Sequence, residues 1–174
     1  PEHHQAHVMI GTRCFGAEDP RQLPLFMLNN LLGGPGMNSL LNVELRERRG
    51  YVYNVESNLA LYADCGLLSV YLGCDASDLR ASMRVLDRVV ERLATVGLSA
   101  RRLDAAKRQF CGQLVVAADS TEWVAMNACR QVLRYGEYMP LAEVMARYGA
   151  VSGEQIRAAA RRLLAPERSS LVYR

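Results

Sequence analysis

Residues 32–53 read LGGPGMNSLLNVELRERRGYVY, and the rest of the chain is organised around this stretch. Three glycines around Pro35 predict a tight turn, because glycine adopts backbone angles that a Cβ forbids. Asn38 or Ser39 can cap a helix that follows the turn and ends at Gly50. The stretch therefore predicts a glycine-rich turn, a short helix and the start of an aromatic strand.

The short helix is expected to be amphipathic and half exposed. Leu41 and Leu45 lie four residues apart, so they share one helical face. Charged side chains occupy much of the remaining surface, and Arg46 lies near the boundary between the two faces. We expect the two leucines to join the core and the charged residues to face outward.

The flanking sequence predicts an α+β fold. Alternating apolar residues predict strands over 5–15, 51–61 and 67–74, with a hairpin turn over 62–66 and a last strand in the tail from Arg168. Helical spacing predicts helices over about 23–32 and 79–97. A third helix is capped by Ser99, and its buried face carries Leu103, Ala106, Phe110 and Leu114. A fourth begins with a capping box of Asp119 and Glu122 and carries Trp123, Met126, Val132 and Leu133. Pro140 opens a fifth helix, and a capping box of Ser152 and Gln155 begins a sixth, which ends at about residue 165. This order indicates an antiparallel β-sheet with α-helices packed on one face.

Composition indicates one ordinary globular domain over residues 1–174. Half of the residues are apolar, which is enough for one core. The charges, 21 basic against 18 acidic, are too balanced to indicate nucleic acid or a membrane surface as a partner. Five widely spaced cysteines without a C-x-x-C pair indicate free thiols in a reducing compartment. We expect a cytoplasmic location, or a periplasmic one if the parent carries a signal peptide.

Two features bear on chemistry that this chain could carry by itself. Its histidines are His3, His4 and His7, and no glutamate stands between them as in metallopeptidase motifs, so we predict no metal site and no self-contained nucleophilic catalysis. The glycine turn lacks the lysine of a phosphate-binding loop and follows a helix instead of a strand, which disfavours nucleotide binding. A plain helix-to-helix connection remains open as its role.

The same residues resemble a known family. LGGPGMNSLLNVELRERRGYVYNVES, the hairpin YADCGLLSVYLGC, the QAHVMIG strand, the LDAAKRQFCGQLV helix and the closing LLAPERSSLVY are similar, in order and spacing, to the second half of the pitrilysin, insulysin and mitochondrial processing peptidase family of zinc metallopeptidases. In that family two α+β halves close around a peptide, and the first half alone carries the H-x-x-E-H zinc motif. This chain lacks the motif and an initiator methionine, so it resembles an excised C-terminal, non-zinc half.

The resemblance implies specific roles. It assigns Arg46 and Tyr53 as residues that reach across the cavity to the substrate, where a guanidinium and a phenol can donate hydrogen bonds to a carbonyl or an oxyanion. It further implies that the turn residues Gly33, Gly34, Gly36, Met37 and Asn38 bind substrate. It implies no cofactor in this domain, zinc in the parent enzyme, an N-terminal zinc-bearing half in cis or in trans, and a peptide substrate.

Two observations keep alternatives open. Arg46 could instead pair with Glu44 or Glu47 while Tyr53 packs in the sheet. Leu40 stands where the family commonly has an arginine, which puts the local loop geometry or one substrate contact in doubt.

Three functions follow from these expectations. The first is the substrate-binding and transition-state-supporting half of a zinc metalloendopeptidase that is inactive alone. The second is a non-catalytic scaffold or the partner subunit of a peptidase heterodimer. The third is a free-standing adaptor that binds extended peptides by sheet-edge addition.

Overall fold

The computed structural model describes residues 5–173 and contains a four-stranded antiparallel sheet in the order β2-β3-β1-β4. The strands are β1 (Gln5–Cys14), β2 (Val52–Leu61), β3 (Gly66–Asp75) and β4 (Ser169–Tyr173). β2 and β3 form the expected hairpin, β1 pairs with β3, and the chain returns at its end to pair β4 with β1. β2 and β4 are therefore the two edges of the sheet.

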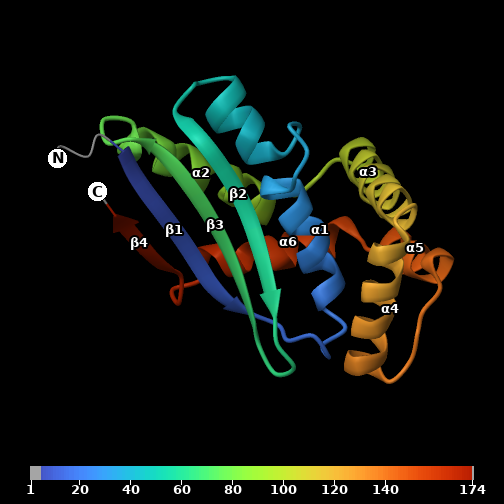
Figure 1. The fold of residues 1–174 in the computed structure, drawn as a ribbon. Coiled ribbons are helices and arrows are strands. Elements are labelled where there is room, and N and C mark those ends of the chain that lie inside the picture. The colour runs from blue at the N-terminus through green and yellow to red at the C-terminus, as the bar shows by residue number, and fades with distance from the viewer. Residues whose placement is uncertain (1–4, 174) are drawn as a thin grey trace.

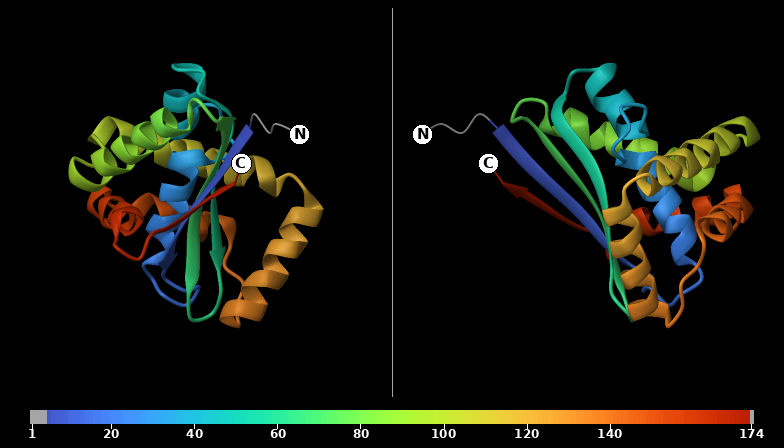
Figure 2. Two further views of the ribbon diagram at one scale, coloured as in Figure 1. Left: turned by 90° about the vertical axis from the view of Figure 1, so that its left-hand side faces the viewer. Right: turned by 45° about the vertical axis from the view of Figure 1, so that its right-hand side comes forward.

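The helices lie behind the sheet and beyond its β2 edge (Figures 1 and 2). They are α1 (Gln22–Gly33), η1 (Asn42–Glu47), α2 (Leu79–Thr95), α3 (Ala100–Ala118), α4 (Thr121–Tyr135), α5 (Leu141–Ala150), α6 (Gly153–Arg161) and η2 (Arg162–Leu164). α1, α2 and α6 cover one face, and the other face is bare. This arrangement confirms the predicted α+β class with helices on one face of an antiparallel sheet.

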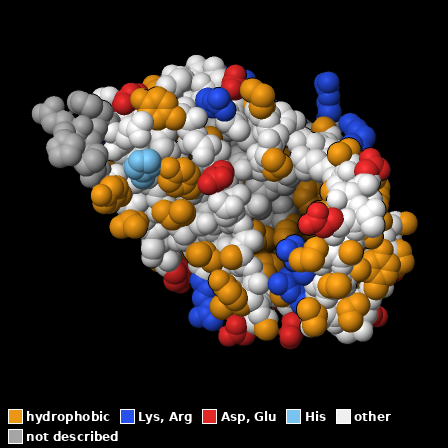
Figure 3. Space-filling view, viewed as in Figure 1, with side chains coloured by type: hydrophobic (Ala, Val, Ile, Leu, Met, Phe, Trp, Pro, Cys, Tyr) orange, Lys and Arg blue, Asp and Glu red, His pale blue; other side chains and the backbone are white. Residues whose placement is uncertain are grey.

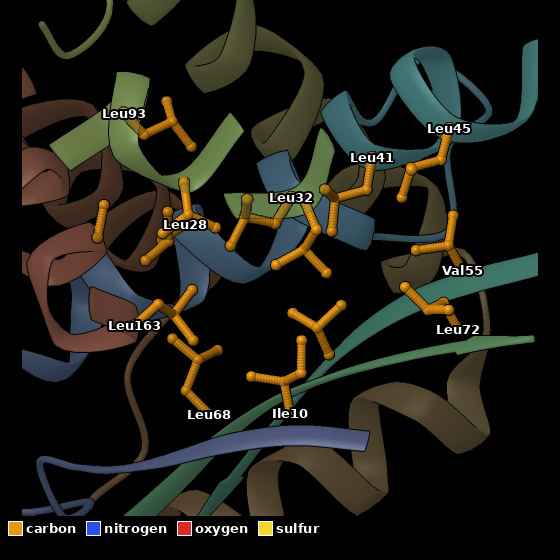
Figure 4. Close-up of a cluster of buried hydrophobic side chains, with 14 of the residues drawn as sticks. Ile10, Leu28, Leu32, Leu41, Leu45, Val55, Leu68, Leu72, Leu93 and Leu163 are labelled. Atoms are coloured by element: carbon orange, nitrogen blue, oxygen red, sulfur yellow. The ribbon is translucent and has the colours of Figure 1, made fainter. Parts of the chain in front are cut away.

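The core lies between the sheet and these helices (Figure 4). Alternate residues of β1, including Val8 and Ile10, are buried, as the period of two in a strand requires. Leu28 and Leu32 of α1 meet them from the helical layer. Fully burying a leucine contributes about 1.5–3 kcal/mol, so these contacts fix the end of α1 against the sheet.

The predicted helix caps are partly confirmed. The Ser99 hydroxyl accepts from the Arg102 N–H, and Ser152 forms the predicted capping box with Gln155. The capping box of Asp119 and Glu122 is wrong, because Ser120 caps α4 by accepting from the Trp123 N–H at 3.2 Å. Asp119 instead continues the end of α3. The error is one residue, between two neighbouring side chains that both favour caps.

The outer helices are less buried than their apolar periodicity predicts. On α3 only Ala106 is buried, while Leu103, Phe110 and Leu114 are half-buried. α4 contains no buried residue, and its Leu133 is 87% exposed. Apolar side chains consequently gather on the surface over α4 and over the bare face of the sheet (Figure 3). No helix in residues 5–173 is long and apolar enough to cross a membrane.

Candidate functional site

The turn between α1 and η1, residues 34–41, is called the glycine loop below. It begins where α1 ends at Gly33, which lies against β2: an added Cβ there would be 2.5 Å from the backbone nitrogen of Ser57. Only glycine allows the helix end to approach the strand so closely. The Ser57 hydroxyl and the Asn29 side chain, 2.7 Å apart, add a second link between β2 and α1. The start of the glycine loop is therefore held against the edge strand β2.

Ser39 directly precedes the helix, and its carbonyl accepts from the Val43 N–H as that of a capping residue does, but the predicted side-chain cap is not formed. The Ser39 hydroxyl is buried and has no hydrogen-bond partner within residues 5–173. Asn38 exchanges two hydrogen bonds with Gln109 of α3, at 2.8 and 3.1 Å. Leu40, at the position where the family commonly has an arginine, is half-buried and packs against the core. Met37 is 67% exposed.

Arg46 lies on η1, which is wound as a π-helix. The Arg48 N–H donates to the Val43 carbonyl, five residues back, which is the π-helical spacing. Leu41 and Leu45 are fully buried, as predicted, and anchor this segment in the core. One extra residue per turn rotates the positions after Leu41 relative to an α-helix, and Arg46 emerges exposed.

Glu44 engages the two arginines that follow Arg46. Its carboxylate oxygens lie 2.6 Å from Arg48 and 2.6 Å from Arg49, and the hydrogen bond from Arg49 lowers the pKa of Glu44. Within residues 5–173, Arg46 forms no ion pair with Glu44 or Glu47. The structure therefore does not contain the alternative ion pair of Arg46 with Glu44 or Glu47.

Tyr53 occupies a β-bulge. Val52 is opposite Cys74 and Asn54 is opposite its neighbour Gly73, so Tyr53 is the extra residue in β2. A bulge redirects the side chains beside it, and Tyr53 is 56% exposed. Hydrogen bonding to the Asp75 carboxylate raises the pKa of Tyr53. Tyr53 does not pack into the sheet.

A groove of about 540 Å³ joins these elements. It lies in front of α1, between β2 and α3, where the surface in Figure 3 is hollowed. Among the predicted site residues, Arg46, Gly33, Gly34 and Met37 line it. Tyr53 directly precedes the lining strand segment 54–58, whereas Gly36 and Asn38 are not part of the lining.

Sequence reasoning missed most of the groove wall. Five asparagines line it: Asn29, Asn30, Asn42, Asn54 and Asn58. Phe26 and Phe110 add an apolar part. Each carboxamide can both donate and accept, so this wall suits the main chain of a peptide. The sequence contains one local indication of this wall. Asn29 and Asn30 are two consecutive polar residues in an otherwise apolar helix, and such residues are not expected to face the core.

A larger hollow, about 690 Å³, lies at the end of β1 around Phe15. Arg21 binds Asp19 there, and the guanidinium carbons of Arg21 and Arg162 lie 3.9 and 4.6 Å from the centre of the Phe15 ring. None of the predicted site residues lines this hollow. The groove that contains Arg46 is accordingly the candidate site.

The described residues offer no metal centre. Within residues 5–173 no three His, Cys, Asp or Glu side chains gather as ligands. The Nδ1 atom of His7 lies 2.8 Å from the Tyr71 hydroxyl, which gives this histidine a structural partner on the neighbouring strand. His3 and His4 lie outside the described residues. The side chains of residues 5–173 therefore do not fit a zinc site.

The amino-acid sequence is similar to those of known proteins. The sequence profile of the peptidase M16 inactive domain matches residues 1–110. An uncharacterized zinc protease of Streptomyces coelicolor is 34% identical over 160 residues, which cover 92% of this chain and 35% of that protein. The beta subunit of the human mitochondrial-processing peptidase is 26% identical over 159 residues, covering 87% of this chain and 32% of that subunit.

Solved structures share the fold. The structure of a peptidase M16 inactive domain from Pseudomonas fluorescens superposes with a TM-score of 0.81 at 22% identity, over 97% of this chain and 40% of that one. The chain thus spans about a third of the length of its matched relatives.

Proposed function

Because the chain belongs to the peptidase M16 family and corresponds to its inactive domain, we propose that it is the substrate-binding and transition-state-supporting half of a zinc metalloendopeptidase. Zinc is held by an N-terminal half, in cis or in trans, and supplies the activated water. We expect the chain alone to have no peptidase activity, since residues 5–173 gather no metal ligands. Zinc proteases among the relatives support this proposal.

The observation that carries the proposal is the exposed guanidinium of Arg46 in the groove. Glu44 is already occupied by Arg48 and Arg49, so it does not compete for this group. Arg46 can donate hydrogen bonds to a substrate carbonyl oxygen, and these bonds strengthen as the oxygen becomes negative. The Tyr53 hydroxyl is protonated and would exchange its Asp75 contact for the same oxygen or its neighbour.

The groove also suits the rest of an extended peptide. β2 is an edge strand, so it can accept another strand in register. The asparagine side chains on both sides can bind peptide N–H and C=O groups without regard to side-chain identity. Phe26, Phe110 and Met37 provide contacts for one apolar side chain. We propose that Gly33, Gly34 and Met37 contact the substrate and that Gly36 and Asn38 shape the loop.

A second candidate is a non-catalytic scaffold or partner subunit. The match to a subunit of the human mitochondrial-processing peptidase favours it, because that protein is named as one part of an assembly. The two candidates differ in whether the other half carries an intact H-x-x-E-H motif. Reading the complete gene and its neighbours distinguishes them.

The test is single substitution in the full-length enzyme with an internally quenched fluorogenic peptide. Arg46→Ala is expected to lower kcat about 100-fold and Tyr53→Phe about 10-fold, with KM changed little, because the lost bonds strengthen only in the transition state. Arg80→Ala and Tyr62→Phe are matched controls, since both side chains are exposed and lie outside the groove. Wild-type kcat in both test variants would contradict the proposed role.

A further inference from the structure

We infer that Gln109 is a positioning residue that holds the glycine loop in its substrate-binding conformation through its amide pair with Asn38. The inference rests on the proposed function, and it concerns a residue outside the groove. Within residues 5–173 this pair is the only side-chain hydrogen bonding that connects the glycine loop to another element. The Ser39 hydroxyl, which could have served as a side-chain cap, has no hydrogen-bond partner in the part of the chain that the structure describes.

The pair is reciprocal. The Asn38 amide donates to Gln109 Oε1 at 2.8 Å, and the Gln109 amide donates to Asn38 Oδ1 at 3.1 Å. Gly36 lies beneath it: an added Cβ would be 2.5 Å from Asn38 Oδ1 and 3.0 Å from Gln109 Nε2. The glycine at position 36 therefore leaves the space in which the two amides meet. Two simultaneous bonds fix both the distance and the orientation of the loop relative to α3.

The α3 side of the pair is held firmly. Phe110, the next residue, packs edge-on against the buried Tyr148 of α5, with ring centres 4.6 Å apart. One helical turn away on the other side of Gln109, Ala106 is buried, and the Lys107 ammonium donates to the Gly149 carbonyl at 2.7 Å. Gln109 thus projects from a segment that is packed on α5, and it transmits this fixed position to the loop.

Loss of the pair should weaken ground-state binding and leave turnover intact. Gly34, Pro35 and Met37 of the loop line the groove, so releasing the loop changes how a peptide is bound. Arg46 is positioned separately, by the burial of the preceding η1 residue, Leu45, in the core. Contacts that are equal in the ground state and the transition state affect the dissociation constant without affecting kcat.

The experiment uses the full-length protein treated with a chelator, so that a fluorescein-labelled 20-residue casein peptide is bound and not cleaved. Fluorescence anisotropy gives its Kd. Gln109→Ala and Asn38→Ala are each expected to raise Kd about 2- to 10-fold, the usual value of one or two such bonds, and the double variant no further. The exchange Asn38→Gln with Gln109→Asn restores the pair and should bring Kd within about twofold of wild type.

Gln113→Ala is the matched control. It removes the same side chain from the same helix one turn later, and within residues 5–173 the Gln113 side chain forms no hydrogen bond. Its Kd should equal that of the wild type. In zinc-loaded protein, kcat of Gln109→Ala should also equal the wild-type value, which a general loss of structure would not give.

The outcomes separate this inference from the proposed function. Wild-type Kd in Gln109→Ala, failure of the exchange variant to recover, or a lowered kcat in Gln109→Ala overturns the inference. If Arg46→Ala still loses turnover in that case, the proposed function stands. Wild-type turnover in Arg46→Ala, or no binding of the peptide by the wild-type protein, overturns the proposed function and the inference with it.

Discussion

At the scale of the residue, the important neighbour of Arg46 is Glu44. One carboxylate binds both Arg48 and Arg49, so a run that is rich in both charges leaves one guanidinium directed to the groove. Sequence spacing favours one of these pairs, because Glu44 is four residues from Arg48 and only two from Arg46. The pair with Arg49, five residues away, matches the π-helical winding of η1, which the spacing did not predict.

The Glu44 cluster predicts a pH-dependent stability. Its folded pKa is lowered, so the cluster stabilises the protein above the unfolded-state pKa, and this contribution is lost as the pH falls through the folded pKa. Because Arg48 is largely exposed, Glu44→Gln should cost at most about 1 kcal/mol at pH 7. In urea unfolding the difference from wild type should shrink steadily between about pH 5 and 3.

Glu47→Gln provides the control for that series, since Glu47 is an exposed neighbour that forms no ion pair in residues 5–173. Its unfolding free energy should follow the wild type at every pH. A Glu44→Gln difference that stayed constant down to pH 3 would show that the carboxylate charge is not what the cluster uses.

At the scale of the element, two irregularities position the two candidate residues. Arg46 lies on a π-helix and Tyr53 is the extra residue of a β-bulge. Both distortions redirect side chains and are common next to functional sites. Neither could be predicted here, because Leu41 and Leu45 fit an α-helix as well as a π-helix, and residues 51–61 fit an unbroken strand.

Other parts of the elements were predictable for a physical reason. The buried faces of β1 and η1 follow from apolar spacing, because those segments have the core directly behind them. Apolar spacing on α4 also predicted a buried face, but that face stays exposed. Periodicity shows that one face of a helix is apolar, but it does not show whether another element covers that face. The asparagine wall of the groove comes from three separated segments, which only the fold brings together.

The surroundings of Gly33 and Gly112 predict opposite effects of a glycine-to-alanine substitution on stability. Gly33→Ala forces a Cβ to 2.5 Å from the Ser57 backbone and should destabilise the protein by about 1–3 kcal/mol. Gly112→Ala, inside α3, meets nothing within 4 Å and should stabilise it by up to about 1 kcal/mol. Thermal unfolding of both variants checks this, and equal shifts would refute the close approach of α1 to the sheet.

At the scale of the whole molecule, the chain has the features of one half of a site. Its groove is lined by Arg46 and by several carboxamides, and residues 5–173 gather no metal ligands. It spans about a third of the length of its matched relatives, and the family profile that it matches is that of the inactive domain. This agrees with the proposal that an N-terminal half supplies the zinc.

The most direct test of this account is to incubate the purified 174-residue chain with zinc and a peptide that the full-length enzyme cleaves, and to analyse the products by mass spectrometry. We predict that the peptide remains intact with the isolated chain and is cleaved by the full-length enzyme in parallel. Cleavage by the isolated chain that a chelator stops and that His7→Ala abolishes would contradict the account.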